Sequence, residues 1–154
     1  MHKSIAAGVI ALAPMLAAGQ SAVAAGPQSV ALVAATTFDL EPDDITSAAG
    51  ALGVACTGGT TTDSFFHAGP DPDKWGNPSG KAQLRVGKVF HCTGGDFNAS
   101  LSVELDLATQ MTSGTWVITS GTGDFAHLRG HGSIVGVPFD GGIEDRYTGV
   151  ITGT

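Results

Sequence analysis

The sequence of 154 residues has few basic side chains and few aromatic ones. Seven Lys and Arg residues stand against 14 Asp and Glu residues, so the formal net charge is −7. A chain with this charge repels the phosphate backbone of nucleic acids and the surface of anionic lipid membranes. We therefore exclude nucleic acid as a partner and assign the charge to solubility.

Several catalytic and cofactor-binding motifs are missing as well. The sequence contains neither the G-x-S-x-G motif of serine hydrolases nor the H-E-x-x-H motif of zinc proteases. The stretch GTGDFA at Gly121–Ala126 matches the G-x-G-x-x-G/A pattern of dinucleotide-binding proteins, but the glycines and proline that follow exclude the helix this motif requires. The stretch GNPSGK at Gly76–Lys81 lacks the spacing of a P-loop. We expect no cofactor and no metal, and nothing here favours an enzyme.

Residues 1–25 have the pattern of a secretory signal peptide. Lys3 is followed by the apolar run IAAGVIALAPMLAAG and then by the small residues of a cleavage site. The run is too short and too rich in Ala and Gly for a membrane anchor. We therefore expect cleavage after Ala24 or Ala25 and a secreted monomer with no membrane contact. The remainder, residues 26–154, has the length of one domain.

The chain has two cysteines, Cys56 and Cys92, and both lie in the part expected to be exported. An even number of cysteines in an oxidising compartment predicts a disulfide. Closing this loop would stabilise the fold by about 4 kcal/mol in the chain-entropy model. The alternatives are two buried thiols or a metal pair, and a metal site would need further ligands close by.

Glycine is frequent, and Val, Thr and Ile recur between the 23 glycines. This composition is typical of short strands joined by tight turns. The clearest strand is Phe97–Leu107, where apolar and polar residues alternate with a period of two. Further strands are expected at Ser29–Phe38, Gly50–Thr57, Lys81–Cys92, Gly114–Ser120, Gly132–Val137 and Ile143–Ile151.

Helical periodicity is almost absent after the leader. Residues 40–52 could form one short helical turn, capped by Asp43 or Asp44 and stopped by Gly50 or Gly53. Many short strands with almost no helix indicate an all-β domain, either a sandwich or a closed barrel.

The C-terminal third carries a specific motif. The stretch SGTWVITSGTGDFAHLRGHGSIVG at residues 113–136, followed by DRYTG at residues 145–149, resembles small exported actinobacterial proteins of unknown function. It is also similar to a bacterial domain family of unknown function built around G-T-G-x-(F/L)-x-x-L-x-G-x-G. That family looks like the allene oxide cyclase and dirigent group of β-barrels. The resemblance implies a single antiparallel barrel of about eight strands, with a β-sandwich as the alternative.

The glycines of this motif are expected to be structural. Gly121 and Gly123 would supply positive φ angles for a tight turn. Gly130 and Gly132 would allow a bend or a close approach of two backbones. Phe125, between these pairs, would fill the interior of the domain.

The first functional hypothesis is a binding module. The studied members of the resembled group hold hydrophobic small molecules inside the barrel. Phe90, Leu105, Trp116 and Tyr147 are the residues expected to line such a cavity and to bind a small apolar ligand there or at the barrel mouth. No residue matches a cyclase active site, so no catalytic residue is assigned.

The alternative is an extracellular interaction protein. The three prolines of the segment 67–80 predict a long loop, and binding residues are often found on such loops. Trp75 would anchor a partner protein or a cell-wall polymer. Asp71 and Asp73 in the same loop could belong to a loose surface calcium site, although the EF-hand pattern is excluded.

Two further sets of titratable residues need an interpretation. His127 and His131 are four residues apart, but in a strand this spacing separates them by about 13 Å, so we expect surface histidines. Asp145 shares a strand face with Tyr147. If that face is interior, the carboxylate needs a partner such as Arg129 or Tyr147, either as a structural pair at the rim or, less favoured, as a catalytic acid.

Overall fold

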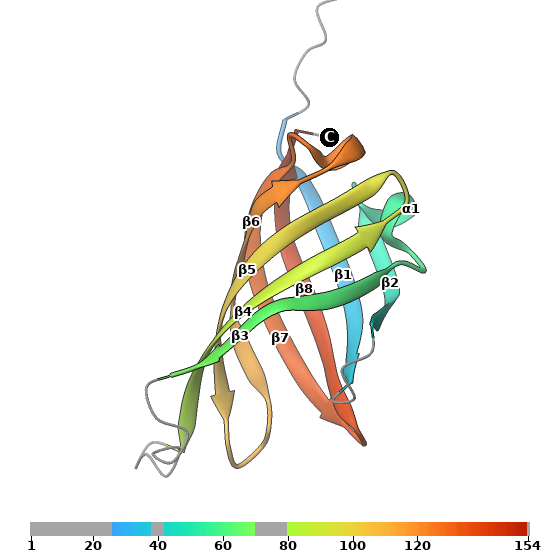
Figure 1. Cartoon of the computed structure of the whole chain (residues 1–154). Coiled ribbons are helices and arrows are strands. Elements are labelled where there is room, and N and C mark those ends of the chain that lie inside the picture. The colour runs from blue at the N-terminus through green and yellow to red at the C-terminus, as the bar shows by residue number, and fades with distance from the viewer. Residues whose placement is uncertain (1–25, 38–41, 70–79, 154) are drawn as a thin grey trace, which may run out of the picture.

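The computed structural model of the chain describes residues 26–37, 42–69 and 80–153. Eight strands form one closed antiparallel barrel in which each strand pairs with its neighbours in sequence and the first closes on the last (Figure 1). The prediction of an all-β barrel of about eight strands is confirmed, and the sandwich alternative is wrong.

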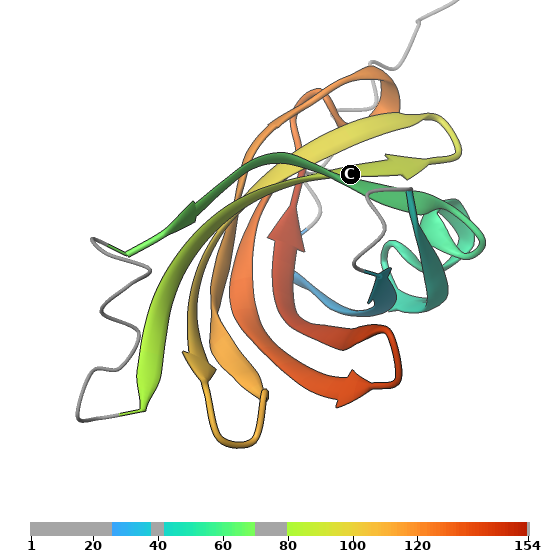
Figure 2. The ribbon, with the colours of Figure 1, turned by 60° about the horizontal axis from the view of Figure 1, so that its bottom comes forward.

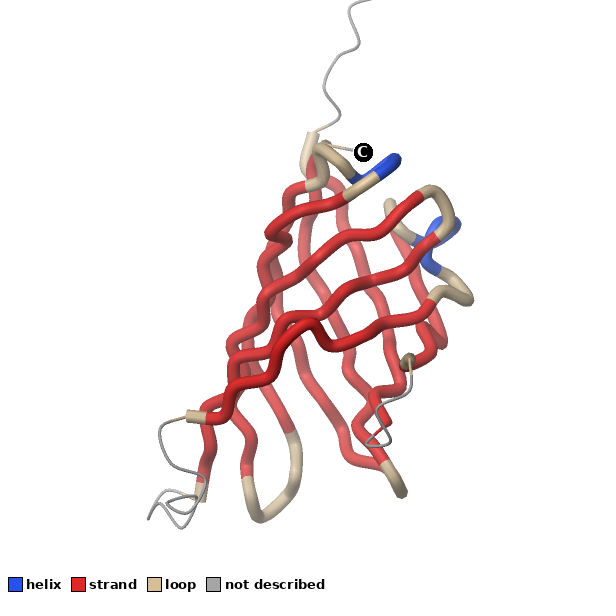
Figure 3. The backbone as a smooth tube through the Cα atoms, in the orientation of Figure 1, coloured by secondary structure: helices blue, strands red, loops and turns tan. Residues whose placement is uncertain are grey.

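The strands are β1 (Gln28–Thr37), β2 (Asp43–Gly50), β3 (Thr60–Ala68), β4 (Lys81–Cys92), β5 (Gly95–Asp106), β6 (Thr112–Gly121), β7 (Arg129–Phe139) and β8 (Gly142–Thr152). Two short helical segments, α1 (Gly53–Cys56) and the 3-10 helix η2 (Gly123–Phe125), complete the described structure. Both lie at one end of the barrel, which we call the helix end (Figures 1 and 3). The β5–β6 and β7–β8 turns lie at the opposite end, which we call the turn end.

The core follows from alternation along the strands. Along β5, Phe97, Ala99, Leu101 and Val103 are buried, while the residues between them are less so. Because successive side chains point to opposite faces of a strand, closing the sheet places one set of residues inside the barrel. The inward set of every strand therefore decides what the interior can hold.

One seam of the barrel is much shorter than the others. Among the described residues, β2 and β3 pair only at Asp43 with Thr61 and at Asp44 with Thr60. After these pairs β2 contacts α1, whereas β3 leaves β2 and follows β4 (Figure 2). Asp43 therefore lies where the barrel wall is held by the fewest hydrogen bonds.

Two expectations for residues 40–57 are wrong. Residues 43–50 form strand β2 instead of a helical turn, because they pair with β1 from Ala35 to Val30. Asp43 caps no helix, and its Oδ1 accepts a hydrogen bond from the Thr37 amide at 2.7 Å. The segment Gly50–Thr57, expected as a strand, turns at Gly50 with φ +72° and then forms α1.

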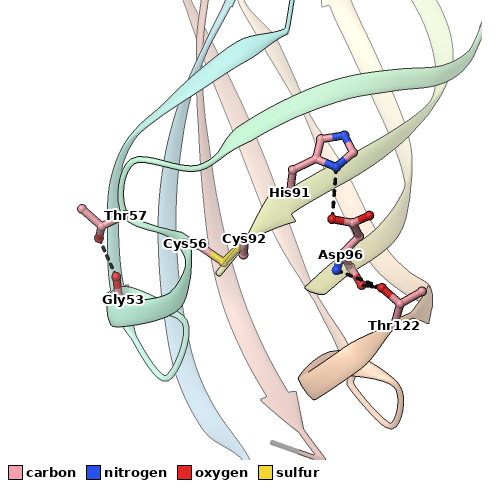
Figure 4. Close-up of a disulfide and its surroundings, with 7 residues drawn as sticks. All are labelled: Gly53, Cys56, Thr57, His91, Cys92, Asp96 and Thr122. Carbon is pink, nitrogen blue, oxygen red and sulfur yellow. Dashed lines mark hydrogen bonds and ion pairs between the residues drawn. A yellow bond between two sulfur atoms is a disulfide. The ribbon is translucent and has the colours of Figure 1, made fainter. Parts of the chain in front are cut away.

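The disulfide between Cys56 and Cys92 is present and joins α1 to the end of β4 (Figure 4). Cys56 is fully buried, and its Cα lies 4.5 Å from that of Cys92. The bond closes a chain loop with a sequence separation of 36 residues, which corresponds to about 4 kcal/mol of stabilisation in the chain-entropy model. It holds the helix end together beside the short β2–β3 seam.

The glycines of the C-terminal motif lie at two kinds of position. Gly123 begins η2 with a φ of +55°, in the left-handed region, whereas Gly121 ends β6 without a positive φ. Gly130 and Gly132 lie in β7 against β8. A Cβ on Gly132 would overlap the Thr148 carbonyl and lie 2.7 Å from the Trp116 ring, so this position requires glycine for close approach.

Candidate functional site

The interior of the barrel has two parts of opposite character. The first, which we call the aromatic half, centres on Phe90. Its ring stacks on Phe97 at 4.6 Å between centroids and meets Tyr147 edge-on at 5.4 Å. Phe97 in turn contacts Phe125 of η2 edge-on at 5.6 Å, so this half lies toward the helix end. Such geometries are the favoured ones for aromatic pairs and add to the free energy gained by burial.

A small hollow lies within the aromatic half. Four of its lining residues are the aromatic ones Phe90, Phe97, Trp116 and Tyr147. The other five are the aliphatic Val30, Leu32, Leu52, Ala99 and Ile118. The cavity volume is about 20 Å³. The hollow is apolar and has room for one or two waters.

Three of the four residues expected to bind a ligand, Phe90, Trp116 and Tyr147, lie side by side around this hollow. The Trp116 indole N–H is satisfied, since it donates to the Ser133 and Thr148 carbonyls at 3.1 and 3.2 Å. Leu105 lies elsewhere. It is half-buried near the end of β5, opposite Thr112, and does not line the hollow.

The second part, which we call the polar half, centres on Lys88. This side chain is only 3% exposed, and its ammonium lies 2.9 Å from Asp63 Oδ1 and 3.2 Å from Asp43 Oδ2. It also donates to Thr36 Oγ1 at 3.3 Å. A lysine ammonium has three donors, so Lys88 is fully satisfied by these three oxygens.

Electrostatics keep this lysine charged. Burial disfavours the ammonium, but attraction to Asp63, Asp43 and Asp145 outweighs it, so the pKa of Lys88 lies above its ordinary value. Three carboxylates thus surround one ammonium. The excess of negative charge makes this part of the interior unfavourable for a further anion.

Asp145 is the carboxylate least compensated by this arrangement. Its Oδ2 accepts a hydrogen bond from Thr36 Oγ1 at 2.9 Å. Burial raises the pKa of Asp145 to about 6, and the hydrogen bond from Thr36 and the charge of Lys88 only partly oppose this shift. The expected partners were wrong, since the Arg129 guanidinium donates to the Leu128 carbonyl and the Tyr147 hydroxyl finds no hydrogen-bond partner among the described residues.

Three buried hydroxyls lack hydrogen bonds within the described residues. They belong to Thr61, Thr112 and Tyr147. Buried polar groups are nearly always paired, and an unpaired one costs about 1–3 kcal/mol. Tyr147 lies where the two halves meet, because its ring lines the hollow and its strand neighbour Asp145 belongs to the polar half. Tyr147 therefore joins the apolar hollow to the polar half.

Sequence reasoning missed the centre of the polar half. Lys88 has the same parity in β4 as Leu84, Val86 and Phe90, which are all buried. That alternation is a signal for an inward-pointing lysine and could have been used. Asp43 had no comparable signal, because its inward direction follows from the pairing of β2 with β1.

A second polar group lies on the outside of the barrel. His91 Nδ1 lies 3.1 Å from Asp96 Oδ1 (Figure 4), and His91 Nε2 lies 3.0 Å from Thr62 Oγ1. The order hydroxyl, imidazole, carboxylate is that of a hydrolase triad, but such a site also requires oxyanion donors. Thr62 lies within β3, opposite Val89 of β4. We interpret this row as a tie between β3, β4 and the start of β5.

Other expected sites are only partly within the described residues. Trp75, Asp71 and Asp73 of the long loop lie outside them. Within them, no group of three or more His, Cys, Asp or Glu side chains is placed to hold a metal ion. His127 and His131 are both exposed, as expected for surface histidines. No described helix is long and apolar enough to cross a membrane.

Comparisons with protein families, curated proteins and solved structures find no match for this chain. The fold assignment therefore rests on the barrel itself, with its eight strands in sequence order. The function has to be inferred from the two halves of the interior.

Proposed function

We propose that this chain is an exported, monomeric barrel that binds a small and largely apolar molecule in its aromatic half. The observation that carries the proposal is the apolar hollow lined by Phe90, Phe97, Trp116 and Tyr147, with the unpaired Tyr147 hydroxyl beside it. Sites for small molecules are typically apolar clefts with a few well-placed polar groups.

The size of the hollow limits the ligand. Drug-sized ligands occupy pockets of about 300–1,000 Å³. The cavity here measures only about 20 Å³. The ligand is therefore small, or the side chains around the mouth move apart when it enters.

The resemblance of residues 113–149 to barrels of the allene oxide cyclase and dirigent group supports the same proposal. Members of that group hold hydrophobic molecules inside the barrel, and the eight-stranded antiparallel architecture here is compatible with that use. The proposal transfers no catalytic residue from that group.

Export is part of the proposal. Its support is the leader-like pattern of residues 1–25, which lie outside the described residues, together with the Cys56–Cys92 disulfide. Disulfides persist in oxidising compartments and are rare in the cytosol. The mass of the protein recovered from culture medium tests this. We expect the chain without its first 24 or 25 residues and without two hydrogens.

Native mass spectrometry of the same preparation tests binding. We expect an additional, organic-extractable mass, or its appearance after incubation with lipophilic extracts. The matched variants are Ala99→Leu, which fills the hollow, and Ala82→Leu, which is equally a buried alanine but does not line it. Loss of the ligand in Ala99→Leu alone supports the proposal. Retention in Ala99→Leu, or no ligand in any preparation, contradicts it.

The second candidate function is binding of a partner protein or cell-wall polymer through the segment 67–80. One described observation favours it. The strand leading into this segment, β3, exposes two large aromatic rings, Phe65 at 40% and Phe66 at 54%. Trp75→Ala would weaken such binding and leave ligand binding in the barrel unchanged, which separates the two candidates.

A further inference from the structure

Three neighbouring strands bring polar atoms to one point inside the barrel. Thr112 of β6 pairs with Gly136 of β7, which pairs with Asp145 of β8. Gly136 has no side chain, and a Cβ there would overlap the Thr112 hydroxyl and lie 2.8 Å from Asp145 Oδ1. The hydroxyl and the carboxylate oxygen therefore converge over the glycine from its two sides.

The hydrogen bonds around this point are incomplete. The Thr112 hydroxyl is buried and has no hydrogen-bond partner in the described part of the chain. Asp145 accepts from Thr36 through Oδ2, and the described residues provide no donor to Oδ1. Lys88 cannot donate to Asp145 Oδ1, because its three N–H groups already interact with Asp43, Asp63 and Thr36.

Tyr147 lines the hollow of the aromatic half, whereas Thr112 and Asp145 do not. It lies two residues after Asp145 on the same inward face of β8, about 7 Å along the strand. Its ring lines the hollow and its hydroxyl has no partner. Burial raises the pKa of Tyr147, and the nearby charges of Asp145, Asp63 and Asp43 raise it further. The phenol is therefore neutral and able to donate.

We propose that Thr112, Asp145 and Tyr147 form a site for the hydroxyl group of an apolar alcohol whose hydrocarbon part occupies the aromatic half. The inference rests on the proposed function and names the chemical class of the ligand. An alcohol hydroxyl accepts hydrogen bonds from Tyr147 or Thr112 and donates one to Asp145 Oδ1. One group thereby satisfies atoms that the protein leaves unpaired.

Other polar groups fit this site less well. A carboxylate would be repelled by the excess of negative charge from Asp43, Asp63 and Asp145. An ammonium would be attracted by this excess of negative charge, but it offers no acceptor to the Thr112 and Tyr147 hydroxyls. An ether accepts but cannot donate, so Asp145 Oδ1 would stay unpaired. Ligands of similar length that differ only in their polar group therefore distinguish an alcohol site from the alternatives.

The experiment is calorimetric titration of the mature, disulfide-bonded protein with 1-hexanol, methyl pentyl ether, hexylammonium and hexanoate. We expect 1-hexanol to bind about tenfold more tightly than the ether, as one additional hydrogen bond predicts. We expect hexylammonium and hexanoate to bind more weakly than 1-hexanol.

Single substitutions test which residues cause the preference for 1-hexanol over the ether. Thr112→Val and Tyr147→Phe each remove one hydroxyl and are expected to reduce the affinity for 1-hexanol several-fold, with little effect on unfolding. Thr115→Val makes the same change on the outer face of β6 and serves as the matched control, with no effect expected. Gly136→Ala, which fills the point of convergence, should abolish the preference if the variant folds.

The outcomes separate this inference from the proposed function. Equal binding of 1-hexanol and the ether overturns the alcohol site and leaves the apolar pocket standing, with water filling the polar point. Tightest binding of hexylammonium or hexanoate also overturns it. If no probe binds, both proposals are overturned. A hexanol preference that Thr112→Val removes and Thr115→Val keeps supports the inference.

Discussion

The aromatic and polar halves of the barrel interior share strands β1, β4 and β8, whereas β2 and β3 supply Asp43 and Asp63 to the polar half alone. In the aromatic half, Phe90 and Phe97 are surrounded by apolar neighbours, and the one indole N–H has two acceptors. In the polar half, one ammonium faces three carboxylates, and hydroxyls remain unpaired nearby. The first half stabilises the fold. The second holds buried charges and unpaired hydroxyls, whose burial costs free energy.

The largest effect is expected from Phe90→Ala in the aromatic half. Phe90 contacts two other rings, so its removal leaves a cavity as well as losing burial. We expect the free energy of unfolding to fall by about 4 kcal/mol. Chemical denaturation measures it. Phe139→Ala, at a ring that is 44% exposed, is the control and should cost far less. Similar losses of unfolding free energy in Phe90→Ala and Phe139→Ala would contradict a stabilising role for the aromatic half.

Lys88→Met should have the next largest effect. It leaves Asp43 and Asp145 buried without their counter-charge, at a cost of about 3 kcal/mol near pH 7. The cost should shrink in acid, where the carboxylates become neutral. Lys81→Met breaks an exposed pair with Glu104 and should change stability very little. A Lys88→Met protein as stable as the wild type would contradict a charged core.

Asp145→Asn should stabilise the protein. The folded-state pKa of about 6 lies above the ordinary value of 3.8, so the folded state binds the proton more tightly than the unfolded state. The stability that this proton contributes is complete below about pH 4 and is lost as the pH rises through 6. At about 1.36 kcal/mol per pKa unit, the variant should therefore gain about 3 kcal/mol at pH 7.5 and far less at pH 4.

Denaturation at the two pH values measures this gain. Asp44→Asn, at the exposed neighbour of Asp43, is the matched control and should leave the pH dependence unchanged. A variant that loses stability at pH 7.5 would mean that Asp145 is well compensated in the folded state.

Tyr147→Phe should have the smallest effect. Its hydroxyl is buried and has no hydrogen-bond partner within the described residues, so removing it takes away no bond and relieves a desolvated group. We expect the free energy of unfolding to change by less than about 1 kcal/mol, toward greater stability. A loss of 2 kcal/mol or more would show that the hydroxyl is paired, for example by a structural water.

Much of the aromatic half could be predicted from the sequence. Phe90, Trp116 and Tyr147 lie on apolar faces of alternating segments, and the structure places all three around one hollow. Leu105 lies on the same face of β5 as the buried Phe97 and Ala99, but it lies farther along the strand, opposite Thr112. Parity gives the face of a strand, whereas the level along the barrel depends on register, which the sequence does not specify.

The polar half was harder to predict for the same reason. Lys88 could have been placed inside by parity alone, but its partners Asp43 and Asp63 come from other strands. The convergence of Thr112 and Asp145 requires knowing that both pair with Gly136. The helical turn expected within residues 40–52 failed through a different cause, since residues 44–50 pair with β1 and this pairing overrode the local preference.

The most direct test of the account is a carbon-13 NMR titration of the Asp145 carboxyl group, without and with 1-hexanol. The account predicts a midpoint near the pKa of about 6 in the free protein, because the group is buried. It also predicts a lower midpoint with 1-hexanol, because a donated hydrogen bond favours the charged carboxylate. A midpoint near 4 that 1-hexanol does not move would contradict both the desolvated polar half and the alcohol site.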